Sequence, residues 1–175
     1  MEVFLQGAPN LENVILHSTA VDNLIFSSSW TSLRHLDISN TLISALNYGG
    51  TISTVLDLKR HTSLNSINAN NNYSVTEIQC PNIESHKINL GSGAFKGCSS
   101  LTRLIGNFLI TGTKVFTNCS SLRLNNDYTG VILESPFIEG NFCNISFDPN
   151  LSSYSEMFSG SGISGQDFRY IMDKV

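Results

Sequence analysis

Histidine and cysteine are the side chains of this sequence best suited to metal binding and to nucleophilic chemistry. The chain contains His17, His35, His61 and His86, and Cys80, Cys98, Cys119 and Cys143. The histidines are scattered and lack the His-Glu-x-x-His spacing that places two ligands on one helix face. The cysteines form no Cys-x-x-Cys pair of the kind found in zinc ribbons and thioredoxin-like sites. The spacing therefore predicts no metal site.

Two glycine-rich segments resemble catalytic loops only superficially. Residues 91–97 lack the G-x-G-x-x-G spacing and the Gly-Lys-Ser/Thr ending of phosphate-binding loops. Residues 160–165 do not fit G-x-S-x-G, the nucleophile turn of α/β-hydrolases. No nucleophile, base and orienting residue can be nominated together. We therefore expect a protein that is not an enzyme, with no catalytic residue and no cofactor.

The overall composition argues against several other functions. Of the 175 residues, 41% are hydrophobic and only 14% are charged, and the net charge is -4. Nucleic-acid-binding proteins carry a basic surplus, and a membrane helix needs about 20 apolar residues in a row. Residues 1–7 also lack the basic and apolar segments of a signal peptide. We expect one domain over residues 1–175, without nucleic-acid binding or membrane insertion.

An internal repeat accounts for most of the apolar pattern. Residues 94–101 and 115–122 share Phe, Cys, Ser, Ser and Leu at a spacing of 21. Extending this period predicts one phenylalanine per repeat, at Phe95, Phe116, Phe137 and Phe158. The cysteines, 18, 21 and 24 residues apart, follow the same rhythm as small buried side chains. We expect Cys98 and Cys119 to be neighbouring free thiols, and His61 to pack in the same slot.

A short extended pattern follows most repeat starts. The starts are Leu11, Leu33, Leu64, Ile83, Leu101 and Leu122, at intervals of 22, 31, 19, 18 and 21. The pattern L-x-x-L-x-L predicts short strands near residues 35–38, 66–69 and 87–90, with leucines inward and the intervening residues outward. Thr41 and Asn72 occupy a polar slot where a side chain satisfies interior backbone groups. A solvent-exposed loop over residues 70–72 is the alternative.

These motifs resemble a leucine-rich repeat, and the Ala-Phe-x-Gly-Cys-Ser-Ser-Leu phrase resembles the BspA-like (treponemal-type) repeats of surface antigens. The resemblance implies an α/β repeat solenoid in one domain of about seven irregular repeats. Its right-handed coil would carry short parallel strands on one face and irregular or short helical returns on the other. The resemblance also implies a protein at the cell surface, secreted or on a virion. Solenoid ends need caps, so we expect either a fragment of a longer chain or ends that dock on neighbouring subunits.

Two helices are predicted from local signals. The 31-residue interval after Leu33 is too long for a plain coil, and Gly49-Gly50 followed by Thr51 predicts a helix over residues 52–58. Apolar residues at helical spacing predict a terminal helix over residues 167–175.

The outward positions of the predicted strands form a polar ridge with few charges. We take these as candidate ligand-binding residues on the concave face: His35, Asp37, Ser66, Asn68, Lys87, Asn89, Arg103 and Arg123. Such a surface suits recognition by shape and hydrogen bonding rather than by electrostatic steering. An inert solvated face is the alternative for the same residues.

Taken together, these observations predict a non-enzymatic recognition module that binds protein or glycan. The rival interpretation is a structural or docking component of a larger assembly, such as a phage virion or a multi-domain surface protein.

Overall fold

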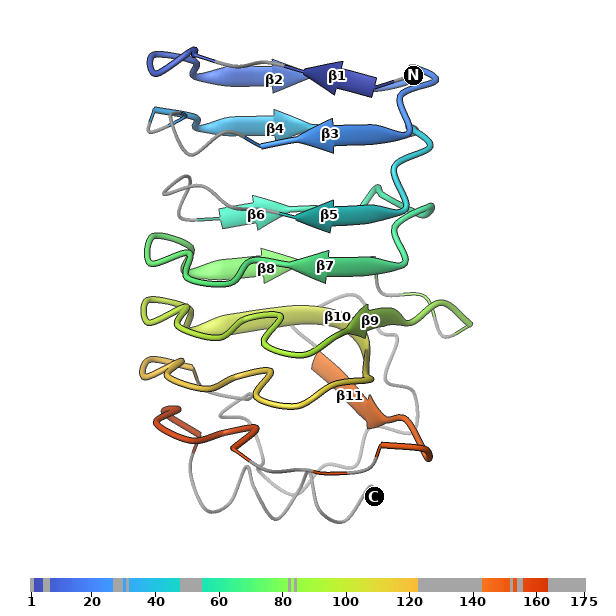
Figure 1. Ribbon diagram of the computed structural model, residues 1–175. Helices are drawn as coiled ribbons and strands as arrows, with labels where there is room; N and C mark the ends of the chain where they lie inside the picture. Colours follow the sequence, from blue (N-terminus) through green and yellow to red (C-terminus); the bar gives the residue numbers. More distant parts are fainter. Residues whose placement is uncertain are drawn as a thin grey trace, which may run out of the picture.

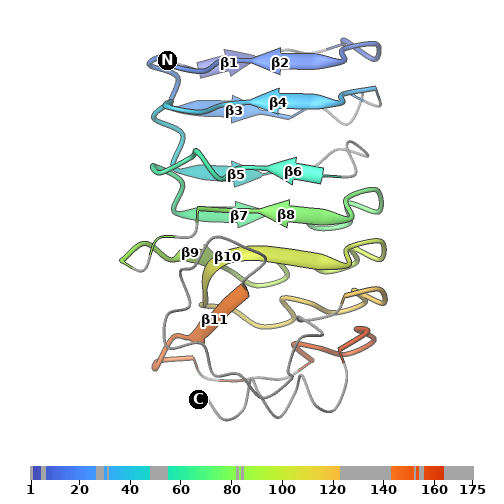
Figure 2. The same ribbon diagram turned by 180° about the vertical axis from the view of Figure 1, so that it is seen from behind.

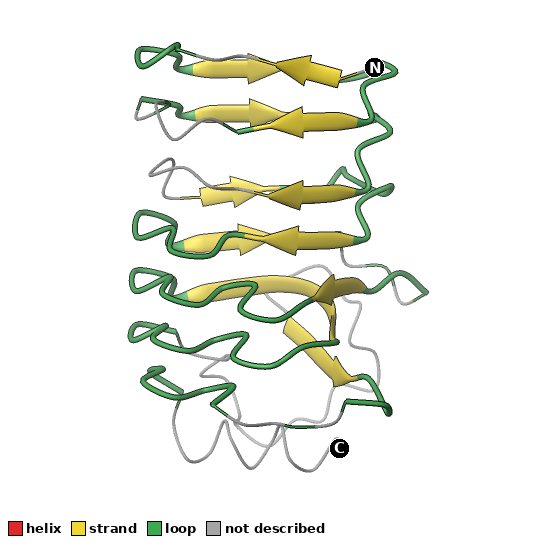
Figure 3. Cartoon of the chain, in the orientation of Figure 1, coloured by secondary structure: helices red, strands yellow, loops and turns green. Residues whose placement is uncertain are grey.

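The chain folds as a parallel β-solenoid in the computed structural model (Figure 1). The structure describes residues 2–4, 7–26, 30, 32–47, 55–81, 83, 85–122, 143–151, 153 and 156–163. These residues contain strands, turns and loops but no helix (Figure 3). The solenoid expected from the repeat is therefore confirmed, whereas the α/β character is not found in the described part of the chain. None of these residues belongs to a helix with the length and apolarity needed to cross a membrane.

The strands form two columns that lie on opposite sides of the core (Figures 1 and 2). The first column contains β1 (Glu2–Phe4), β3 (Asn23–Ile25), β5 (Ala45–Asn47), β7 (Ser66–Asn68), β9 (Ile88–Leu90) and β11 (Cys143–Phe147). The second column contains β2 (Asn13–Ile15), β4 (His35–Asp37), β6 (Val55–Asp57) and β8 (Glu77–Gln79). The long strand β10 (Arg103–Ile110) belongs to both. A single strand-bearing face was expected, and strands occupy both faces instead.

Strand register explains the repeat. Ala45 pairs with Ser66 in the first column and Val55 pairs with Glu77 in the second, so paired residues lie about one period apart in sequence. In β5 and β6 the middle residue, Leu46 or Leu56, is buried and its two neighbours are exposed. Each turn alone is too short to bury its apolar side chains, so stacking on the next turn supplies the core. Burial of one such leucine is worth about 1.5–3 kcal/mol.

Aspartate and asparagine side chains close the corners after several strands. The Oδ1 atoms of Asp37, Asp57, Asn68 and Asp148 each accept a hydrogen bond from the backbone N–H two residues later, at 3.0, 3.1, 2.9 and 2.8 Å. This Asx-turn geometry lets the side chain satisfy a donor that the strand leaves behind. The same device appears in both columns, so it serves the fold at every place where it occurs.

A row of residues with left-handed backbone conformation stacks along one corner. Asn71, Gly97, Asn118 and Gly160 have φ values of 57°, 76°, 61° and 67°. Backbone hydrogen bonds join their turns, from Asn71 N to Lys96 O and from Asn118 N to Ser159 O. The Oδ1 atom of Asn71 lies only 2.5 Å from where a Cβ on Gly97 would be. Asparagine therefore alternates with glycine because its side chain occupies the space that the glycine leaves.

Strand β10 passes from one column to the other without a corner loop. Its residue Arg103 pairs with Glu77 of β8, whereas Phe108 pairs with Ile88 of β9. Gly106 lies between these two segments with φ of 135°, and a Cβ there would be 2.9 Å from the Cβ of Cys80. Glycine is required at this bend because the conformation and the close approach both exclude a side chain.

The phenylalanine stack follows a different order from the one that the period of 21 predicts. The ring centroids of Phe95 and Phe116 are 5.7 Å apart, and those of Phe116 and Phe158 are 5.5 Å apart. Phe116 N also donates to Met157 O at 2.9 Å. Phe158 therefore stacks directly on Phe116, and the prediction of a ring from Phe137 between them is wrong. Phe137 itself lies outside the described residues.

Several other local predictions can be compared with the structure. Strands occur near residues 35–38, 66–69 and 87–90 as predicted. The predicted helix over residues 52–58 is wrong for its described part, because residues 55–57 form β6 and pair with β8. The predicted terminal helix over residues 167–175 lies outside the described residues. Ile83, taken as a buried repeat start, is 41% exposed.

The polar and cysteine slots behave as the repeat predicted. Thr41 is buried and its hydroxyl donates to Ile38 O at 2.8 Å. Asn72 is buried and its Oδ1 accepts from the backbone of Val75 at 3.0 Å. Cys98 and Cys119 are buried free thiols.

The alternation of asparagine and glycine at the corner gives a stability test. We expect Gly97→Ala to lower the free energy of unfolding by about 1–3 kcal/mol, since alanine is strained at this φ and collides with Asn71. Gly91→Ala is the control, because nothing lies within 4 Å of the position that its methyl group would occupy and φ is not left-handed. Urea denaturation measures both variants. Equal stability of the two would contradict the packing explanation.

Candidate functional site

The predicted ligand-binding residues lie on both columns rather than on one concave sheet. His35 and Asp37 are on β4 and Arg103 is on β10, at the outer surface of the second column. The first column carries the others in or beside β7 and β9, namely Ser66, Asn68, Lys87 and Asn89. Arg123 lies outside the described residues. The split arises because each turn contributes two strands, so outward positions point away from the core in two directions.

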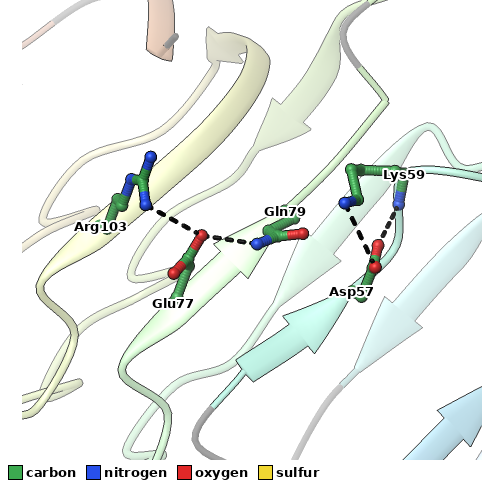
Figure 4. Close-up of polar contacts among 5 residues, drawn as sticks. All are labelled: Asp57, Lys59, Glu77, Gln79 and Arg103. Atoms are coloured by element: carbon green, nitrogen blue, oxygen red, sulfur yellow. Dashed lines mark hydrogen bonds and ion pairs between the residues drawn. The ribbon is translucent and has the colours of Figure 1, made fainter. Parts of the chain in front are cut away.

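Several of these side chains already have partners within the protein. Arg103 lies 3.6 Å from Glu77 on the paired strand, and Gln79 donates to the same carboxylate at 2.6 Å (Figure 4). Lys87 donates to the hydroxyl of Ser146 at 3.0 Å. Asn68 closes an Asx turn. These contacts give the residues a structural role that the sequence pattern alone did not indicate.

The backbone ladder is interrupted between β4 and β6. Strand β4 completes a two-stranded sheet with β2, and β6 belongs to the next sheet, where it pairs with β8. The first column shows the same division, with β1 and β3 in one sheet and β5 in another. Figure 1 shows a wider step between the turns at this level than between their neighbours. Contact is kept by the backbone hydrogen bond from Leu42 to Val21, at 2.8 Å.

A cavity of about 260 Å³ lies at this interruption. Core side chains and outward side chains of the two turns line it together. The lining residues are Leu33, Arg34, His35, Leu36, Asp37, Ser39, Val55, Leu56, Asp57, Lys59, Arg60 and His61. We take this β4–β6 cavity as the candidate functional site, since it brings charged, polar and apolar groups from adjacent turns to one place.

The two carboxylates of the β4–β6 cavity are held by local hydrogen bonds. The Ser39 hydroxyl donates to Asp37 Oδ1 at 2.6 Å, and its backbone N–H donates to the same atom. These bonds lower the pKa of Asp37 below its usual range. Asp57 accepts from the backbone N–H of Lys59, whose Nζ lies 3.5 Å from the second carboxylate oxygen (Figure 4). Both carboxylates are thus fixed in position as acceptors.

His61 forms the buried end of the cavity lining. It is only 6% exposed, as predicted from its place in the cysteine slot. Burial lowers the pKa of His61 below 6.5, and the nearby carboxylates of Asp37 and Asp57 partly oppose this effect. The imidazole is therefore neutral at pH 7 and adds no positive charge to the cavity at that pH.

The buried thiols lie elsewhere and are poor nucleophiles. Cys98 Sγ donates to Ala69 O and Cys119 Sγ donates to Phe95 O, both at 2.9 Å. Burial raises the pKa of Cys98 to about 11 and that of Cys119 to about 12. Since the thiolate is the reactive form, these two side chains act as packing groups. The described residues also contain no cluster of three or more His, Cys, Asp or Glu able to hold a metal ion.

Comparisons with known proteins add no functional assignment. The chain matches no protein-family model, no curated protein and no solved structure. The leucine-rich-repeat resemblance therefore stays a prediction, and the function has to be inferred from the geometry of the β4–β6 cavity.

Sequence reasoning found part of this cavity and missed its basic residues. His35 and Asp37 were predicted, whereas Arg34, Lys59 and Arg60 were not. One signal was available, because the whole lining falls within the irregular interval of 31 residues between Leu33 and Leu64. A turn that departs from the period cannot keep the same register, and the cavity lies at that departure.

The Asx turn at Asp37 separates a structural role from a charge effect. We expect Asp37→Ala to lower the free energy of unfolding by about 1 kcal/mol, because two hydrogen bonds from Ser39 are lost. Asp37→Asn keeps an Oδ1 acceptor and should retain most of the stability. Thermal denaturation at neutral pH measures both variants. An asparagine variant as unstable as the alanine variant would count against the turn.

His61 predicts a specific dependence of stability on pH. Its folded pKa is lower than its unfolded value near 6.5, so the unfolded chain binds the proton more tightly. The stabilising contribution is therefore complete above pH 6.5 and is lost as pH falls toward the folded pKa. Urea denaturation over this range should show a shallower pH slope for His61→Gln. A folded His61 midpoint above 6.5 in an NMR titration would contradict the prediction.

Proposed function

We propose that this chain is a non-enzymatic recognition module that binds protein or glycan through the β4–β6 cavity, at a cell surface, in a secreted setting or on a virion. The observation that carries the proposal is the convergence of charged, polar and apolar side chains where the ladder is interrupted. Binding sites commonly combine an apolar surface with a few fixed polar groups that set orientation. The surface setting comes from the family resemblance.

The rigidity of the cavity walls supports a binding role. Asp37 and Asp57 are held by Asx turns, and both walls are strands whose middle side chains are anchored in the core. A site built on fixed elements loses little conformational entropy when a ligand binds. Preorganisation of this kind favours recognition without a large change in shape.

A structural or docking component of a larger assembly is the second candidate function. The uninterrupted ladder from β5 through β7 and β9 to β10 and β11 favours this interpretation, because it makes a stiff stack. The stacked rings of Phe95, Phe116 and Phe158 reinforce the same region. On this view the solenoid is a spacer, and the β4–β6 cavity needs no ligand.

An array experiment with matched tryptophan variants tests the recognition function. Val55→Trp places a large side chain at the cavity wall, on an outward strand position that is 42% exposed. Ala45→Trp makes the same change at the first position of β5, outside the cavity lining. We expect the unaltered chain and Ala45→Trp to bind members of a printed array of neutral glycans, acidic glycans and peptides. Val55→Trp should lose that binding.

Folding of each variant is checked by its thermal unfolding midpoint, and His35→Trp provides a second obstruction from the opposite wall. Binding that survives in both Val55→Trp and His35→Trp would place recognition elsewhere. Absence of binding by the unaltered chain to every array class would favour the structural function.

A further inference from the structure

We propose that the β4–β6 cavity binds the carboxylate-bearing sugar of an acidic glycan, with Arg34 and Arg60 as the groups that recognise its charge. This inference rests on the proposed recognition function and names its ligand class. Three features support it: the balance of charges, the pattern of acceptors and apolar surface, and the size of the cavity.

Basic groups exceed acidic groups in the lining, although the chain as a whole is acidic. Arg34, Lys59 and Arg60 face this region together with Asp37 and Asp57, whereas the net charge of the chain is -4. Three of the ten Lys and Arg residues therefore line one small cavity. Such local enrichment in a chain with few charges points to an anionic group in the ligand.

The partners of these charges leave the two arginines available. Lys59 is paired with Asp57, and Asp37 is engaged by Ser39. Within the part of the chain that the structure describes, Arg34 and Arg60 form no ion pair, and both are exposed. A guanidinium binds a carboxylate through charge-assisted hydrogen bonds that are stronger than those between neutral groups.

The remaining lining suits the hydroxyl groups and the C–H surface of a sugar. The carboxylates of Asp37 and Asp57 are fixed acceptors to which sugar hydroxyls can donate. Leu36 and Val55 supply apolar surface from the two walls. A simple inorganic anion would use the arginines but would leave these acceptors facing negative charge. The combination therefore favours an anion that carries its own hydrogen-bond donors.

Size and charge distinguish a sugar from an acidic peptide. The cavity volume of about 260 Å³ is below the range of about 300–1,000 Å³ typical of drug-sized ligands, and it suits an occupant about as large as one monosaccharide. A peptide strand lying along β4 would need several residues, each extending the chain by about 3.3 Å. Acidic side chains on that strand would also approach Asp37 and Asp57. These features favour the sugar.

The position of the arginines predicts a mechanical consequence of binding. Arg34 precedes β4 in the upper two-stranded sheet, whereas Arg60 follows β6 in the next sheet. A ligand that contacts both therefore connects two sheets that the backbone ladder does not join at this level. Binding should protect the amides of β4 and β6 from hydrogen exchange more than those of β8.

Titration calorimetry with simple probes tests the ligand class. D-glucuronate is the acidic sugar, D-glucose the neutral sugar, sodium acetate the bare carboxylate, and a tri-glutamate peptide the acidic peptide. We expect glucuronate to bind best, and Arg34→Gln and Arg60→Gln each to weaken its binding about tenfold. Lys87→Gln is the matched control, because Lys87 contacts Ser146 outside the cavity lining and should leave binding unchanged.

The other outcomes overturn the inference in separable ways. Equal binding of glucose and glucuronate would remove the requirement for charge but would leave the cavity as a recognition site. Stronger binding of acetate or of tri-glutamate would replace the sugar with a bare anion or a peptide. Absence of glucuronate binding, while Val55→Trp still abolishes binding to the array, would refute the ligand class and leave the proposed function standing. Loss of glucuronate protection at β4 and β6 without loss of affinity would refute the bridging geometry.

Discussion

The parallel backbone ladder between turns about one period apart is the constraint on which the rest of this solenoid depends. Most strands contain only three residues, which is too few to be stable without neighbours on the adjacent turns. Register then decides which side chains meet. It places Phe116 against Phe158 and Asn71 against Gly97, because those residues occupy equivalent positions on consecutive turns. Corner bonds such as that of Asp57 keep each turn in the shape that the ladder requires.

The candidate site follows from a local failure of the same constraint. Between β4 and β6 the turns are not joined as their neighbours are, and the space between them is lined by side chains from both. Elsewhere along the second column, an outward pair such as Glu77 and Arg103 is close enough for cross-strand contact. At the interruption, Arg34 and Arg60 remain exposed instead. A solenoid can therefore gain a binding cavity without adding a domain, simply by departing from its repeat in one turn.

Part of this structure was predictable from the chain alone, and the failures have physical causes. Short strands near 35–38, 66–69 and 87–90 followed from alternating apolar residues, since that alternation is local. The helix expected over residues 52–58 failed because pairing of β6 with β8 overrides a weak local preference. Half of the cavity was missed because Lys59 and Arg60 become neighbours of His35 only through the stacking of two turns.

The amino-acid sequence by itself determined the period, the inward residues and the slots for Thr41, Asn72 and Cys98, because each is set by spacing within one or two turns. Tertiary structure alone decided that strands occupy both faces, that β10 bends at Gly106 between columns, and that Phe158 follows Phe116. It also decided where the ladder is interrupted. The physical reason is that backbone pairing joins residues a whole turn apart, and a change in the length of one turn alters every contact with the next.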